Sequence, residues 1–106
     1  MMNILRAGFN IGDVIIHREQ KFRGVIVDVD ADFQGSDEWY NQFTTNEPAK
    51  NLPWYHILVD EEGSMAYVSE QNIYVDSSNM EVEHPMVDDI FKDYDQGHYL
   101  PRQTIN

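Results

Sequence analysis

The chain has 106 residues, and a hydrophobic content of 42% is enough for one domain with one core. Nineteen acidic residues face seven basic ones, and the formal net charge of −12 disfavours strong attraction to phosphate backbones or anionic lipid. The absence of cysteine excludes disulfides, thiolate zinc sites and a cysteine nucleophile. The sequence shows no secretory signal pattern and no apolar run long enough to span a membrane, so we expect a cytoplasmic protein without a membrane partner.

Short apolar runs separated by turn signals predict five strands. They cover residues 14–17, 23–30, 53–60, 64–68 and 73–75. In the second of them, period-two alternation predicts one face made by Val25, Val27 and Val29. The opposite face is then made by Ile26, Asp28 and Asp30.

Residues 31–51 form a polar segment that is too long for a simple hairpin loop. Trp39, Tyr40 and Phe43 lie inside it, and such large aromatic side chains predict that the segment folds back on the barrel. Residues 37–43 are expected to form a short helical stretch within it. The whole pattern predicts a mainly β fold, a small SH3-like barrel with a long inserted loop and a short C-terminal helix.

The C-terminal part is expected to start with a linker over residues 76–83. Pro85 suits the first turn of a helix, and Met86, Ile90 and Tyr94 would share one face of it. Residues 97–106 show no clear period. We therefore expect a single domain over 1–106, with a core over about 9–86 and a C-terminal extension over 87–106.

The side chains that could act in catalysis do not form a pattern that predicts an enzyme. The four histidines, His17, His56, His84 and His98, are expected to pack and hydrogen-bond locally, with metal ligation or general-base catalysis as the less favoured alternative. No serine lies in a nucleophile elbow and no glycine-rich loop suits a phosphate. We predict no catalytic residue and no cofactor.

An alternation of Asp28, Asp30 and Asp32 is similar to the first half of a calcium-binding EF-hand loop. That loop needs glycine at its sixth position and glutamate at its twelfth, and here those positions hold Phe33 and Trp39. The pattern predicts a strand end with carboxylates on one side, and no metal site. Weak divalent-cation binding is left as the minority alternative.

Two surfaces are candidates for binding. Nucleic acid would need clustered cations, and the candidate DNA-binding residues are Arg18, Lys21, Phe22 and Arg23, where Phe22 would contact a base methyl group. Against a net charge of −12 this cluster predicts weak affinity, and an ordinary solvated hairpin tip is the favoured alternative. A protein partner would meet exposed aromatic rings, and the candidate interface residues are Trp39, Tyr40, Trp54 and Tyr55, although core packing is the alternative for Trp54.

The chain holds an ordered set of motifs, which are Gly12 and His17, residues 24–30, residues 53–59, residues 67–71, and His84-Pro85. This set resembles the HspQ or YccV-like family, also called hemimethylated-DNA-binding domains. The resemblance covers about residues 9–86, and the order of the set is more specific than any one member. The sequence differs from the short bacterial members of this family in the segment 36–43 and in the tail from residue 90. Functions that depend on the tail are therefore the least transferable to this chain.

The resemblance implies an SH3-like barrel, binding to hemimethylated DNA, and a role in heat-shock proteolysis as a specificity factor for the Lon protease. It also implies control of DnaA and a homo-oligomer, with a trimer as the form in bacterial members. Two functions follow. The first is a regulatory adaptor of Lon and its substrates, and the second is a protein that binds hemimethylated DNA directly.

Overall fold

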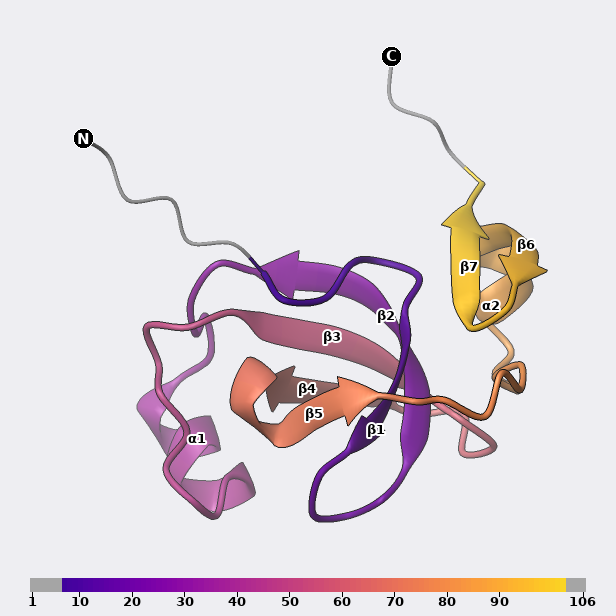
Figure 1. Ribbon diagram of the computed structural model, residues 1–106. Coiled ribbons are helices and arrows are strands. Elements are labelled where there is room, and N and C mark those ends of the chain that lie inside the picture. The colour runs from indigo at the N-terminus through magenta and orange to yellow at the C-terminus, as the bar shows by residue number, and fades with distance from the viewer. Residues whose placement is uncertain (1–6, 103–106) are drawn as a thin grey trace.

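The computed structural model describes residues 7–102 and has a curled five-stranded antiparallel sheet at its centre (Figure 1). The strands are β1 (Val14–His17), β2 (Arg23–Asp30), β3 (Trp54–Val59), β4 (Met65–Ser69) and β5 (Ile73–Val75), in the order β4-β3-β2-β1-β5. The 3-10 helix η1 (Glu70–Asn72) carries the chain from one edge strand, β4, to the other edge strand, β5. The expected mainly β, barrel-like fold is therefore confirmed. Within residues 7–102 no helix has the length and apolar character needed to cross a membrane.

The central strand β2 is buried on both faces, since Val25 and Ile26 are both 0% exposed. The side enclosed by the curl holds an inner cluster, which consists of Ile15, Ile26, Tyr55, Ile57, Val68 and Ile73. The opposite side holds an outer cluster, which consists of Val14, Val25, Leu58, Val82, Val87, Phe91 and Tyr99. The sheet thus has two apolar faces, where the sequence had predicted one apolar and one mixed face.

A β-bulge in β2 explains this difference. The pairing with β3 shifts between Ile26 and Asp28, so that Val27 is the extra residue. Beyond the bulge the alternation changes phase: Val27 packs with the outer cluster and Val29 with the inner one. The prediction that Val25, Val27 and Val29 share a face is wrong for that reason.

The inserted segment does fold back on the sheet, as predicted. Its helix α1 (Asp37–Phe43) has the expected bounds and begins where the Ser36 side chain accepts a hydrogen bond from the Trp39 backbone N–H at 3.0 Å. The Phe33 backbone N–H donates to the Lys50 carbonyl at 2.8 Å, which joins the two ends of the segment.

The C-terminal part differs from its prediction. Helix α2 spans only Val87–Ile90, and a hairpin of β6 (Phe91–Asp95) and β7 (His98–Pro101) follows it. Tyr94 lies on a strand and does not share a helix face with Met86 and Ile90. The hairpin turn has Gln96 and Gly97 at φ of 46° and 90°, a conformation that tight hairpin turns favour.

Gly12 joins this hairpin to the sheet. Its N–H donates to the Ile26 carbonyl at 2.8 Å, and its carbonyl accepts from the Tyr99 N–H at 2.7 Å. Its φ is +99°, and a Cβ placed there would lie 2.1 Å from the Tyr99 carbonyl oxygen. Glycine is required because both the left-handed backbone and the close approach exclude a side chain.

Phe91→Ala should lower the free energy of unfolding by about 3–5 kcal/mol, because it empties a buried aromatic site in the outer cluster. Urea unfolding followed by tryptophan fluorescence would measure this. Leu100→Ala is the matched control on the same hairpin, since Leu100 is exposed. Equal losses in the two variants would contradict the assignment of the hairpin as the cover of the outer face.

Candidate functional site

Arg23, one of the predicted DNA contacts, makes its interactions within the protein. Its guanidinium pairs with Asp60 at 2.7 Å and with Asp76 at 3.1 Å, and it also donates to the Met80 and Glu81 carbonyls. These contacts hold the linker 76–83 against the sheet and bring Val82 into the outer cluster. A guanidinium with two carboxylate partners and little exposure is not free to neutralise a phosphate, so the structure removes Arg23 from the predicted site.

Arg18 and Lys21 remain exposed, and both lie against Tyr74 of β5. The Arg18 guanidinium is 5.6 Å from the centre of the Tyr74 ring, and Lys21 Nζ lies 3.2 Å from the Tyr74 hydroxyl. Phe22 is half-buried and faces the His17 ring at 5.1 Å, which takes it away from these two cations. The structure therefore brings together two of the four predicted DNA contacts and adds Tyr74, which the sequence analysis missed.

Two of the four predicted interface residues are core residues. Trp54 and Tyr55 are 1% and 0% exposed, so they cannot contact a partner from this surface. Successive residues of a strand point to opposite faces, and here both faces are covered. Tyr55 packs in the inner cluster, where burial and its hydrogen bond to Glu70 raise the pKa of its hydroxyl. Trp54 lies on the other face, beneath the inserted segment.

Trp39 and Tyr40 belong to an aromatic cluster that covers Trp54. The cluster consists of Phe33, Trp39, Tyr40, Trp54 and Tyr67, with neighbouring ring centres 4.8 to 6.3 Å apart. Hydrogen bonds from the Tyr40 hydroxyl to the Pro48 carbonyl (2.6 Å) and from Trp54 Nε1 to the Ala49 carbonyl (3.1 Å) fix the returning chain over it. Trp39 and Tyr40 keep part of their surface exposed.

A groove of about 280 Å³ runs beside this cluster, between α1, the β1–β2 turn and β4. Its apolar lining includes Phe22, Trp39, Phe43, Met65 and Tyr67. Phe43 and Met65 are 59% and 55% exposed, which is high for large apolar side chains. Exposed apolar groups gathered at a concave surface mark an interaction site.

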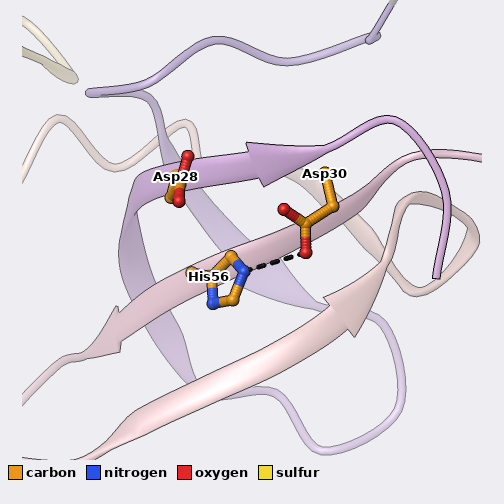
Figure 2. A group of neighbouring side chains, drawn as sticks. All are labelled: Asp28, Asp30 and His56. Atoms are coloured by element: carbon orange, nitrogen blue, oxygen red, sulfur yellow. Dashed lines mark hydrogen bonds and ion pairs between the residues drawn. The ribbon is translucent and has the colours of Figure 1, made fainter. Parts of the chain in front are cut away.

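On the other side of Tyr67, polar groups of β2, β3 and β4 meet. Figure 2 shows Asp28 and Asp30 of β2 beside His56 of β3. Asp30 Oδ2 accepts a hydrogen bond from the Tyr67 hydroxyl at 2.7 Å and lies 3.1 Å from His56 Nε2. Burial, with the hydrogen bond to Asp30, raises the pKa of Tyr67 to about 12, so the hydroxyl stays protonated and keeps donating. Strand pairing places Asp28 opposite His56 and His56 opposite Tyr67, a relation that no local spacing reveals.

Asp28, Asp30 and His56 each offer one ligand atom within 4.8 Å of the others. The third carboxylate of the EF-hand-like alternation, Asp32, instead accepts from the Gln34 amide at 2.5 Å. The arrangement is a pair of strand-end carboxylates beside a histidine, and it departs from an EF-hand because no loop surrounds it.

His17 lies apart from His56, on the inner side of β1. Its Nδ1 accepts hydrogen bonds from the backbone N–H groups of Glu19 and Gln20 at 3.1 and 3.0 Å. Burial lowers the pKa of His17 below its ordinary value; the Glu19 carboxylate acts against this to a smaller extent, and the Lys21 ammonium lowers the pKa slightly further. The neutral ring therefore fixes the turn that carries Arg18 and Lys21.

Acid should unfold the protein partly through His17. Because the pKa of His17 is lower in the folded state, its contribution is present above the unfolded value of 6.5 and is lost as pH falls through the folded value. His17→Asn keeps an acceptor but does not titrate, so its free energy of unfolding should fall less between pH 7 and pH 5. Urea titrations across this range would measure the slope, with His84→Asn as the matched histidine control. An unchanged slope in His17→Asn would refute the assignment.

The fold and these surfaces define a small β-barrel-like domain with an aromatic face and a carboxylate group beside it. The family model described as hemimethylated DNA-binding protein YccV like matches residues 7–98. The chain belongs to this YccV-like family, and the match extends from before β1 into the C-terminal hairpin. No solved structure matches the chain significantly.

Proposed function

We propose that this protein is a non-catalytic binding module that contacts a protein partner through the groove beside α1. The proposal includes the role that the family resemblance implies, an adaptor for Lon-type proteolysis with DnaA among the substrates. The observation that carries it is the groove itself, in which Phe43 and Met65 are more than half exposed. Aromatic and Met side chains are enriched at protein interfaces, and burying this pair on a partner would be favourable. A cytoplasmic location and a homo-oligomer belong to the same proposal.

The contacts of the histidines support a non-catalytic role. Within residues 7–102, the hydrogen-bond partners of the four rings are backbone groups and the carboxylates of Asp13 and Asp30. None of these partners is a hydroxyl that a histidine could activate as a nucleophile.

Replacing Phe43 and Met65 together by Ser should abolish stimulation of DnaA degradation by Lon in a purified system. Both side chains are exposed, so thermal unfolding should change little while the apolar contact is lost. The matched control replaces Val75 and Met80 by Ser, since these are 62% and 63% exposed and do not line the groove. Equal stimulation by both double variants would overturn the placement of the site, and no stimulation by the unaltered protein would overturn the adaptor role.

Direct binding to hemimethylated DNA is the second candidate, favoured by the family description and by the exposed pair Arg18 and Lys21. Two cations against a net charge of −12 support weak, salt-sensitive binding. The cation-bearing turn and Tyr74 would be the contact surface. This candidate can coexist with the adaptor role because the groove is lined by other residues.

Fluorescence anisotropy of hemimethylated, fully methylated and unmethylated duplexes would test this candidate. If DNA binds, the logarithm of the affinity should fall with the logarithm of salt concentration with a slope of about −2, as expected for two phosphate contacts. The double change of Arg18 and Lys21 to Glu should abolish binding in a folded protein. Arg23→Glu should instead lower stability by about 3 kcal/mol or more, because it leaves Asp60 and Asp76 without their cation. Binding that survives the first variant would refute this surface.

A further inference from the structure

A second pocket lies across Trp39 and Tyr67 from the groove. It is open and has a volume of about 330 Å³, and its lining includes the rings of Trp39, His56 and Tyr67 together with Asp30 and residues 34–36. The Trp39 and Tyr67 ring planes meet at 66° with centres 5.6 Å apart, and the His56 ring lies 4.6 Å from Tyr67. Rings at such angles form a corner that presents π faces to one guest.

One carboxylate is fixed at the edge of this aromatic corner. Asp30 lines the pocket, and its Oδ2 is held by Tyr67 and His56. Among residues 7–102, no group donates a hydrogen bond to the other oxygen, Oδ1. Asp28 adds a second carboxylate close by, and Figure 2 shows both carboxylates on the same side of the sheet as the His56 ring. The Asp30 carboxylate is thus positioned and still has capacity to accept hydrogen bonds.

The chain already holds one cation between an aromatic ring and a carboxylate elsewhere in the fold. Lys50 Nζ lies 4.4 Å from the centre of the Tyr40 ring and pairs with Asp37 at 3.0 Å, so the far side of the aromatic cluster holds an ammonium group between a ring and a carboxylate. The pocket beside Asp30 has the same chemistry, and no Lys or Arg of residues 7–102 lines it. Its charge complements a cation that comes from outside.

We propose that this pocket binds an arginine side chain of a protein partner. The guanidinium would stack on Trp39 or Tyr67 and donate to Asp30 Oδ1. Arginine fits better than lysine because its planar group stacks on rings and is less strongly hydrated, which suits a pocket lined mainly by apolar surface. The inference rests on the proposed role as a protein-binding module: the groove would supply apolar contact, and the pocket would select basic segments.

The test adds one of three blocked pentapeptides, with Arg, Lys or Gln between flanking glycines, to the full-length protein. Binding of each peptide is measured by NMR titration. The Arg peptide should shift the resonances of Trp39 and Tyr67 saturably, and should bind at least about tenfold more tightly than the Gln peptide. Asp30→Asn should remove most of this preference. Asp32→Asn is the matched control, because it removes the same charge from a neighbouring carboxylate that does not line the pocket.

Equal binding of the Arg and Gln peptides to the unaltered protein would overturn the proposal, whatever the variants do. Equal effects of Asp30→Asn and Asp32→Asn would also overturn it, because the preference would then be general electrostatic attraction. Binding of the Lys peptide as tight as that of the Arg peptide would refute the choice of arginine.

The proteolysis assay separates this inference from the proposed function. If the Phe43 and Met65 variant loses stimulation but the peptides do not bind, the pocket proposal fails and the adaptor proposal stands. If the Arg peptide binds in the pocket but the unaltered protein does not stimulate Lon, the adaptor proposal fails and the pocket stands.

Discussion

Strand β2 has to be covered on both of its faces, and the other elements are arranged to do this. Val25 and Ile26 are adjacent, point to opposite sides, and are both fully removed from solvent. Covering one side requires the sheet to curl, which η1 completes by joining the two edge strands. The other side is covered by segments that are not part of the sheet, namely the linker, α2 and the β6–β7 hairpin. Figure 1 shows this C-terminal part and α1 at opposite ends of the sheet.

The bulge at Val27 lets the same strand change its role along its length. Before it, β2 contributes apolar residues to both clusters; after it, Val29 stays inside while Asp28 and Asp30 face outward. Pairing with β3 and β4 then aligns Asp30, His56 and Tyr67, and the inserted segment adds Trp39. The pocket beside Asp30 is therefore a product of strand register combined with the inserted segment. Two of its rings, Trp39 and Tyr67, also line the groove beside α1.

Within residues 7–102, three cations make close contacts inside the chain. Arg23 links the sheet to the linker, Lys50 sits on the aromatic cluster, and the Arg102 side chain donates to the Asp88 carbonyl at 2.6 Å. This use leaves the acidic surplus to dominate the surface potential. A protein partner with apolar and basic groups suits such a surface better than a phosphate backbone does, while the family description keeps DNA as a candidate at the turn that bears Arg18 and Lys21.

The five strands of the central sheet, the bounds of α1 and the family could be predicted from the sequence, because these depend on local alternation, turn residues and the order of motifs. The sequence also placed Trp39 and Tyr40 in a segment that returns to the sheet. Three features could not be predicted without the folded structure: the burial of Trp54 and Tyr55 in the core, the internal ion pairs of Arg23, and the contact of Asp30 with His56 and Tyr67. The C-terminal hairpin was missed because its turn holds Gln96 before Gly97, where asparagine or aspartate would be the usual signal, and because the apolar spacing of residues 86–94 also fits a helix. The physical reason is the same throughout: local pattern sets how a segment is extended or turned, whereas strand register, the bulge and the covering segments decide which side chains share a face.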